Sequence, residues 1–136
     1  GGYAQNSLIK AKNENDVFYT DIDLADVEFY SYEPVKDMIE LADLLYSKKF
    51  SYVQGTEGVH DETYKVFVNF INYCDISYMP ANIYNNMPVI EVNGIICAHP
   101  HFMMVDAYRI LTDPMTSYWR IDKTIKNWIK ISIIYR

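Results

Sequence analysis

Three acidic residues in two short apolar segments have the spacing and the chemistry of a metal site. Asp26 and Glu28 lie two residues apart in a segment, 26–31, that reads as a β-strand, so both side chains leave the same face. Two carboxylates on one face repel each other unless a cation lies between them, and Mg²⁺ prefers such hard oxygen ligands. Asp75 lies in a second predicted strand, 73–79, among apolar and small residues, where an aspartate is rarely buried without a role. If a sheet brings Asp75 beside the pair, three acids can hold two metal ions, one activating an attacking hydroxyl and the other supporting a departing pyrophosphate.

Each of these features also has an ordinary structural interpretation, and spacing does not choose between the two. An Asp-x-Glu pair on a strand is commonly a solvated face, and Asp75 by itself fits a capped or salt-bridged acid. Asp21 and Asp23 form a competing acid pair closer to the glycines. Gly1 and Gly2 precede a predicted helix, so their backbone N–H groups could approach a triphosphate at a helix N-terminus. Two glycines at a chain start are as easily an expression remnant.

The other reactive side chains have weaker patterns. His99 and His101 lack the helical spacing and the companion ligands of a zinc site, and we interpret them as helix-start residues. His60 is expected to be exposed in a polar turn. Cys74 and Cys97 have neither disulfide nor metal spacing, which indicates a reducing compartment, and Cys74 is interpreted as a buried residue rather than a nucleophile.

Local signals predict the elements that must position these residues. Good or neutral helix formers predict a short helix over 4–12. Apolar residues at helical spacing or a Pro at the start predict helices over 34–47, 100–111 and 121–129. Runs of β-branched and aromatic residues between turns predict strands over 26–31, 50–53, 63–68, 73–79, 89–92 and 95–98. The segment 13–25 is predicted to be a loop.

Several details of these elements are specific enough to test. In the helix after Glu33-Pro34, the face predicted to pack on a sheet consists of Val35, Met38, Ile39, Ala42 and Leu45. A polar turn is predicted around Gly55 and Gly58. Asn93-Gly94 is the clearest hairpin turn in the chain, because this dipeptide supplies the positive φ angles of a two-residue turn.

Composition narrows the class of protein. A chain of 136 residues, half of them hydrophobic, suits one globular domain, and no stretch approaches the roughly 20 apolar residues of a membrane-spanning helix. The formal charge of -6 argues against a nucleic-acid surface over the whole domain, although an acidic cleft for cations and a nucleotide is compatible with it. Because the chain opens on Gly1 rather than Met, we expect it to be a piece of a longer protein. Basic residues concentrate near its end, where a solvated helix face explains them equally well, at Arg120, Lys123, Lys126, Lys130 and Arg136.

The order of glycines and acids resembles the polymerase-β-type nucleotidyltransferase superfamily, which pairs a Gly-Gly turn with an acid-x-acid strand and a third acid on a later strand. The matching segments here are Gly1-Gly2-Tyr-Ala-Gln-Asn6, Asp26-Val-Glu28 and Tyr73-Cys-Asp75. The likeness is closer to the poly(A) polymerase catalytic subunits of large nucleocytoplasmic DNA viruses, of the poxvirus and giant-virus type. It extends over the hairpin and Pro-opened helix that end at Pro100 and over the block 113–120. The second acid is Glu28 where cellular relatives usually have Asp, and the family's full C-terminal helical region has no counterpart.

The resemblance implies an α+β fold, a nucleotidyltransferase palm with a small mixed, mostly antiparallel sheet backed by helices. The catalytic domain would span residues 1–123, and 124–136 stay unassigned. The implied reaction is template-independent transfer of AMP from ATP to an RNA 3′ end, as in mRNA polyadenylation, by a two-metal mechanism with Mg²⁺ or Mn²⁺. Asp26, Glu28 and Asp75 would be the catalytic metal ligands, and the residues implied to bind the nucleotide are Gly1, Gly2 and Asn6.

The implied partners are ATP, the RNA 3′ end and a second subunit or a second copy through self-association, with no membrane. The implied location is the cytoplasm of an infected cell, in its viral factory, or the virion. Two alternatives stay open. The chain could be a nucleotidyltransferase that uses a different nucleotide or acceptor, or a non-catalytic scaffold module with the same fold.

Overall fold

The structure, a computed structural model, describes residues 2–12, 27–113, 115 and 118–134. The chain divides into two compact units. Residues 1 and 25–86 form the first, called here the sheet unit, and residues 2–24 and 87–136 form the second, the hairpin unit. No helix among the described residues is long and apolar enough to cross a membrane. The single catalytic domain expected over 1–123 spans one unit and most of the other, and stays a prediction.

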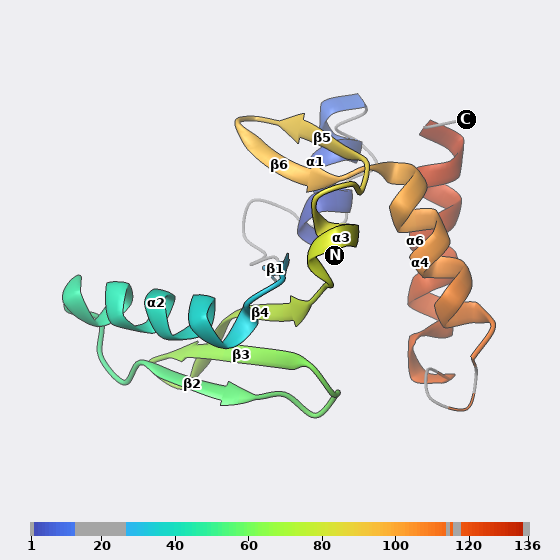
Figure 1. Cartoon of the computed structure of the whole chain (residues 1–136). Helices are drawn as coiled ribbons and strands as arrows, with labels where there is room; N and C mark the ends of the chain where they lie inside the picture. Colours follow the sequence, from blue (N-terminus) through green and yellow to red (C-terminus); the bar gives the residue numbers. More distant parts are fainter. Residues whose placement is uncertain (1, 13–26, 114, 116–117, 135–136) are drawn as a thin grey trace. The chain divides into compact units, whose positions relative to one another are not determined.

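The sheet unit contains four strands in the order β1-β4-β3-β2 (Figure 1). Strand β1 pairs with β4 in parallel, and the other two pairings are antiparallel. This mixed, mostly antiparallel sheet with its helices confirms the predicted α+β class. The bounds of the strands are β1 (Glu28–Ser31), β2 (Gln54–Glu57), β3 (Thr63–Val68) and β4 (Ile71–Tyr78).

Helix α2 (Pro34–Ser47) lies along one face of this sheet (Figure 1). It begins where the sequence predicts, because Pro34 at the first helical position has no N–H to leave unpaired. Its buried face is shifted from the predicted one: Leu45 joins the core, while Val35 and Ile39 are 44% and 52% exposed. The helical spacing of apolar residues predicts that α2 has an apolar face, but it does not determine which side of that face contacts the sheet. The core comprises Leu45, Val66, Cys74 and Ile76, with Met38, Leu41, Val53, Tyr64 and Val68 packed against it.

Strand β2 corrects the sequence interpretation. Residues 50–53 were expected to form a strand, but the strand begins only at Gln54 and includes Gly55, which was expected in a turn. Tyr52 has a φ of 53°, which extended backbone does not allow. All four residues of β2 are exposed, so pairing with β3 rather than side-chain burial makes this segment a strand. A Cβ at Gly55 would lie 2.9 Å from Cγ of Met38, so Gly lets α2 approach the sheet closely.

The hairpin unit contains one two-stranded antiparallel sheet and helices (Figure 1). Its core cluster comprises Leu8, Val92 and Met103, with Ile90 and Ala98 packed against it. Its elements are α1 (Gly2–Lys12), β5 (Val89–Val92), β6 (Ile95–Ala98), α4 (Pro100–Leu111), the 3₁₀ turn η2 (Tyr118–Arg120) and α6 (Ile121–Ile134). Helix α6 continues five residues beyond the predicted end at 129. The short helix α3 (Ala81–Tyr84), at the end of the sheet unit, was not predicted.

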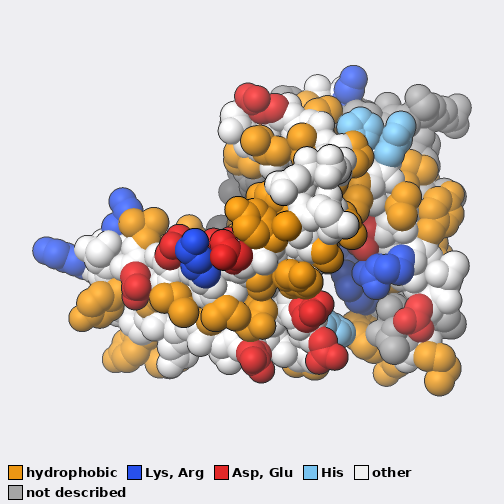
Figure 2. Space-filling model, in the orientation of Figure 1, with side chains coloured by type: hydrophobic (Ala, Val, Ile, Leu, Met, Phe, Trp, Pro, Cys, Tyr) orange, Lys and Arg blue, Asp and Glu red, His pale blue; other side chains and the backbone are white. Residues whose placement is uncertain are grey.

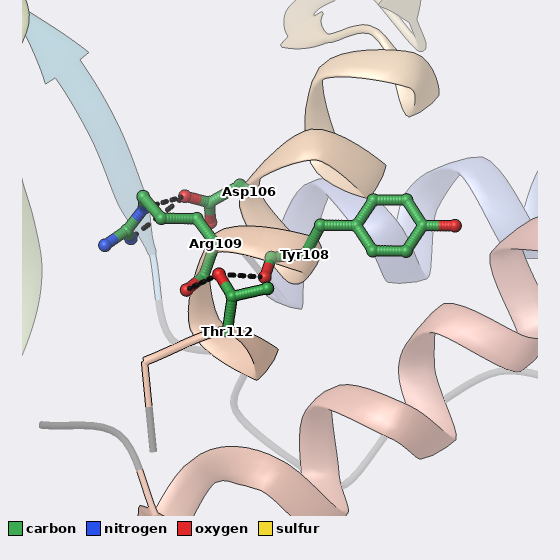
Figure 3. Close-up of polar contacts among 4 residues, drawn as sticks. All are labelled: Asp106, Tyr108, Arg109 and Thr112. Atoms are coloured by element: carbon green, nitrogen blue, oxygen red, sulfur yellow. Dashed lines mark hydrogen bonds and ion pairs between the residues drawn. The ribbon is translucent and has the colours of Figure 1, made fainter. Parts of the chain in front are cut away.

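The hairpin and the helix that follows it match the sequence expectation. Asn93 and Gly94 form the turn with φ angles of 52° and 79°. Helix α4 begins at Pro100, and the Nδ1 atom of His99 accepts a hydrogen bond from the His101 N–H at 3.1 Å. At the other end, the Tyr108 carbonyl accepts both the Thr112 N–H and the Thr112 hydroxyl, each at 2.9 Å; the hydroxyl bond is drawn in Figure 3.

Candidate active site

Two of the predicted acids are direct neighbours in the four-stranded sheet. Glu28 in β1 is the register partner of Asp75 in β4, and the Asp75 N–H donates to the Val27 carbonyl at 2.9 Å. Register partners on adjacent strands, about 4.8 Å apart, direct their side chains to the same face. The parallel pairing of two segments far apart in the sequence therefore makes Glu28 and Asp75 register neighbours, and their role as metal ligands stays a prediction.

Asp75 and its neighbours in β4 divide between the two faces of the sheet. Cys74 and Ile76 are 1% and 0% exposed, and both belong to the core under α2. Because side chains alternate along a strand, Asp75 and its partner Glu28 lie on the opposite face. The carboxylates are thus on the face that α2 leaves uncovered, where a polar ligand can reach them without entering the apolar core.

The carboxylate of Asp75 is held by two side chains from the same hairpin. Lys65 Nζ and Asn72 Nδ2 each donate to Oδ1 of Asp75 at 2.9 Å. The side chain of Asp75 is 20% exposed and that of Lys65 is 30% exposed, so this ion pair is only partly screened by water. Both contacts use the same oxygen, and the second oxygen, Oδ2, takes part in neither.

A β-bulge in β4 creates this arrangement. Phe67 pairs with Asn72, but the next pair is Val66 with Cys74, so Tyr73 is an extra residue with no partner in β3. Without the bulge, Asp75 would lie opposite Tyr64 instead of Lys65. Asn72 and Asp75 are three residues apart, a spacing that places side chains on opposite faces of a regular strand. The bulge therefore brings both donors to the carboxylate.

Sequence reasoning missed Lys65 and Asn72. The second strand of this hairpin was predicted over 73–79, whereas β4 begins at Ile71 and leaves a two-residue turn at Asn69 and Phe70. The strand alternation of Thr63–Val68 was visible, but its register against β4 depends on the bulge. One signal could have indicated the bulge. With a two-residue turn and a regular register, Asp75 would lie opposite Tyr64, on the face that packs against α2.

The other predicted site residues fall into two groups. Asp26, the competing pair Asp21 and Asp23, and Gly1 lie outside the described residues. Gly2 begins α1 and Asn6 lies within it, in the hairpin unit, whereas Glu28 and Asp75 belong to the sheet unit. The role of Gly1, Gly2 and Asn6 in binding the nucleotide stays a prediction.

The donor chemistry suits a hard divalent cation. Glu28 is exposed and Asp75 is its neighbour, and carboxylate oxygens are the protein ligands that Mg²⁺ takes in small numbers beside water and phosphates. Within the ranges the structure describes, no cluster of three or more His, Cys, Asp or Glu side chains is placed to hold a metal ion. The third predicted donor, Asp26, lies outside those ranges. The two described carboxylates therefore fit part of the predicted donor set.

The alternative reactive groups keep their ordinary interpretations. Burial raises the pKa of the Cys74 thiol to about 11, and the charge of Asp75 adds to the shift, so the thiol stays protonated at neutral pH. A protonated, buried thiol is a poor nucleophile. His99 caps α4, and His60 is exposed, as expected for both.

Comparison with known proteins decides the family. The family model described as the poly(A) polymerase catalytic subunit matches residues 1–117. The chain belongs to this family. Its fold agrees with that assignment: over 99% of its length it superposes on the crystal structure of the Megavirus polyadenylate synthase with a TM-score of 0.94 and 43% sequence identity.

Curated viral proteins give the same assignment to the poly(A) polymerase catalytic subunit family. A protein of Acanthamoeba polyphaga mimivirus assigned as such a subunit is 42% identical over 117 residues. Its counterpart in African swine fever virus (strain Badajoz 1971 Vero-adapted) is 32% identical over 102 residues. These matches cover 86% and 75% of the present chain. The chain spans about a fifth of the curated relatives, 20% and 21% of their lengths, and 27% of the Megavirus chain.

Proposed function

We propose that this chain transfers AMP from ATP to the 3′ end of RNA, releasing pyrophosphate, as a polynucleotide adenylyltransferase in mRNA polyadenylation. The observation that carries the proposal is the register of Glu28 and Asp75, in a member of the poly(A) polymerase catalytic subunit family. It supports a nucleotidyltransferase rather than a scaffold, because two neighbouring carboxylates on the sheet face opposite α2 are suitable ligands for a divalent cation.

In this proposal Asp26, Glu28 and Asp75 hold two divalent cations, Mg²⁺ or Mn²⁺. When bound, the cations lower the pKa of the attacking hydroxyl and stabilise the charge of the departing pyrophosphate. Asp26 and Glu28 would be ligands of both cations, and Asp75 would be a ligand of the cation that activates the RNA hydroxyl. Lys65 and Asn72 hold Asp75 through Oδ1 and leave Oδ2 directed elsewhere.

Nucleotide binding is assigned to the N-terminal helix. Gly1 and Gly2 would admit the β and γ phosphates to the backbone at the start of α1, and Asn6, one turn into the helix, would contact the nucleotide. N–H groups at a helix N-terminus have no intrahelical partner and attract anions. The partners proposed for the complete reaction are ATP, an RNA 3′ end and a second subunit or a second copy of the chain.

The decisive experiment is incorporation of α-labelled nucleotides into an RNA primer, with ATP, GTP, CTP and UTP supplied in turn and with Mg²⁺ or Mn²⁺. We expect incorporation from ATP above the others and none with chelator. Preference for another nucleotide would contradict the transfer of AMP but would still be consistent with a nucleotidyltransferase. A chain that incorporates no nucleotide while it binds metal–ATP, or binds none, would support the scaffold alternative.

Addition by this chain is expected to be distributive rather than processive. The chain carries a net charge of -6, which disfavours retention of the RNA phosphates between additions. Product lengths on a denaturing gel, with excess unlabelled competitor RNA added after the start, measure this. Long tails on the first primers bound, at physiological salt, would contradict it.

A further inference from the structure

At the end of the sheet unit where α2 ends (left in Figure 1), hydrophobic and basic side chains share the surface (left in Figure 2). The exposed fractions are 75% for Tyr46, 63% for Tyr52 and 68% for Phe70. Folded chains rarely expose several large rings together without a ligand or partner for them. We call this surface the aromatic tip and define it by Tyr46, Lys48, Lys49, Phe50, Tyr52 and Phe70.

The rings of Tyr52 and Phe70 stack on each other, with centroids 4.9 Å apart and an interplanar angle of 29°. The loop that carries Tyr52 is tied to the β3–β4 turn, because the Asn69 N–H donates to the carbonyls of Ser51 at 3.0 Å and of Tyr52 at 3.2 Å. The stack is therefore fixed by the backbone while its outer surfaces face solvent. Beside it lies a hollow of about 790 Å³ lined by Tyr46, Ser47, Lys49, Phe50, Ser51, Tyr52 and Val53.

The backbone at the aromatic tip takes conformations that its residues disfavour. Phe70 and Tyr52 have φ angles of 66° and 53°, and Lys49 has 65°, all in the left-handed region that favours glycine. Strained positions of this kind concentrate at functional sites. Glycine would adopt the φ of 66° at Phe70 without strain, so the ring stands at a position with a backbone cost.

The charge of the aromatic tip is opposite to that of the whole chain. Residues 44–56 contain Lys48 and Lys49 and no acid, and residues 66–74 contain no charged residue, in a chain with a net charge of -6. Lysines favour phosphates, and exposed aromatic faces stack on unpaired bases. Phe70 precedes Asp75 by five positions, about 17 Å along β4, within reach of one bound strand.

We propose that the aromatic tip binds single-stranded RNA, with bases stacked on Tyr52 and Phe70 and phosphates held by Lys48 and Lys49. This inference rests on the proposed function, in which RNA is the acceptor of AMP. It concerns equilibrium binding without ATP, so it is measured separately from nucleotide transfer.

The test is the anisotropy of a fluorescein-labelled single-stranded RNA, titrated with the chain from about 50 to about 200 mM KCl. Phe70→Gly removes the ring and suits the turn, because glycine adopts a φ of 66° without strain. We expect Phe70→Gly to weaken binding by at least about fivefold at every salt concentration. The double variant Lys48→Gln/Lys49→Gln should reduce the slope of log affinity against log salt by about 1.4, since each phosphate contact contributes about 0.7.

Matched controls come from the same unit. Tyr84→Ser removes an exposed aromatic that packs edge-on against Tyr32 outside the aromatic tip, and Lys36→Gln removes a lysine that pairs with Glu33. Neither variant should change RNA affinity or its salt slope. Equal losses in the controls would overturn the proposal, because they would show general rather than local binding.

Three further outcomes would overturn it: unchanged binding by Phe70→Gly, equal affinity for duplex and single-stranded RNA, or a dimer that Phe70→Gly dissociates while RNA binding persists. The last would assign the aromatic tip to protein contact. The outcomes for transfer are separate. Ring-dependent RNA binding by a chain that incorporates no AMP would refute the proposed function alone, and AMP incorporation with Phe70-independent binding would refute this inference alone.

Discussion

In the part of the chain that the structure describes, two β-hairpins have two-residue turns of similar backbone geometry but differ in the residues at the turn and in strand register. In β5–β6 the turn is Asn93-Gly94, with φ angles of 52° and 79°, and in β3–β4 it is Asn69-Phe70, with 51° and 66°. The first hairpin satisfies the local rule with glycine, whereas the second meets the same geometry with an aromatic residue that pays a steric cost. The β5–β6 register is regular throughout, whereas β3–β4 contains a bulge.

These departures coincide with the candidate functional features. The irregular hairpin carries Asp75, its donors Lys65 and Asn72, and the ring of Phe70, while the regular hairpin contributes Val92 to a core cluster. A hairpin that only closes a core is free to follow local preferences. A hairpin that must orient a carboxylate departs from these local preferences, and packing elsewhere in the fold offsets the cost in stability. Four predictions test this contrast.

The largest expected effect is the loss of nucleotide transfer when Asp75, the acid in the irregular hairpin, is replaced. Asp75→Asn should lower nucleotide transfer by at least about 100-fold, because a metal ligand is lost from the transition state. It should also abolish most of the rise in melting temperature that we expect Mg²⁺ to cause in the parent chain. The stability without Mg²⁺ should change by less than about 1 kcal/mol, since the lost Lys65 pair is partly exposed.

The matched control for Asp75→Asn is Glu91→Gln, an exposed acid in β5. It should leave transfer and the response to Mg²⁺ unchanged. If Asp75→Asn instead melts earlier by several degrees with an unchanged response to Mg²⁺, Asp75 is a structural acid and its assignment as a ligand is wrong.

The second effect concerns the buried cysteine in the second strand of each hairpin. Burial raises the pKa of Cys74 from an ordinary value of about 9 to about 11, so the folded state binds the thiol proton more tightly than the unfolded state does. This stabilisation is complete below pH 9 and is lost as the pH rises through 11, by up to about 2–3 kcal/mol. Urea melts between pH 8 and 11 should show a shallower decline for Cys74→Ala.

Cys97→Ala provides the comparison, because burial also raises the pKa of Cys97. Its effect on the same pH dependence should have the same sign. An alkaline decline that neither substitution alters would mean that tyrosines and lysines cause it, and that the thiols titrate alike in both states.

The third effect is at Lys65, whose ammonium and a divalent cation compete for the same carboxylate. Lys65→Met should lower the Mg²⁺ concentration for half-maximal thermal stabilisation by about tenfold, since a positive charge 2.9 Å from Asp75 is removed. Lys65→Arg keeps the charge and should behave like the parent chain. A Lys65→Met variant that needs more Mg²⁺ would show instead that orientation of Asp75 outweighs the competition.

The smallest effect is expected at the two turns. Gly94→Ala should lower the free energy of unfolding by roughly 0.5–1 kcal/mol through its φ of 79° alone, because nothing lies within 4 Å of the added Cβ. Phe70→Gly should change stability by less, since relief of backbone strain offsets the lost Tyr52 stack. Urea denaturation measures both. A loss above about 2 kcal/mol for Phe70→Gly would make its ring a structural element.

The sequence alone determined the elements whose signals are local. Pro34 and Pro100 open helices at the expected positions, and Asn93-Gly94 forms the expected hairpin. The strands that contain Glu28 and Asp75 were also identifiable, because a two-residue period needs only neighbouring residues. Such features depend on backbone preferences within a few residues, which the same few residues encode.

The tertiary structure decided the relations between distant segments. It selected which edge of α2 packs on the sheet, made Gln54–Glu57 a strand by pairing it with β3, and placed Glu28 beside Asp75 by a parallel pairing. The bulge at Tyr73 then brought Lys65 to Asp75. Adding or removing one residue in a strand moves every later side chain to the opposite face of the sheet. Which register forms depends on how the whole sheet packs against α2 rather than on any local pattern.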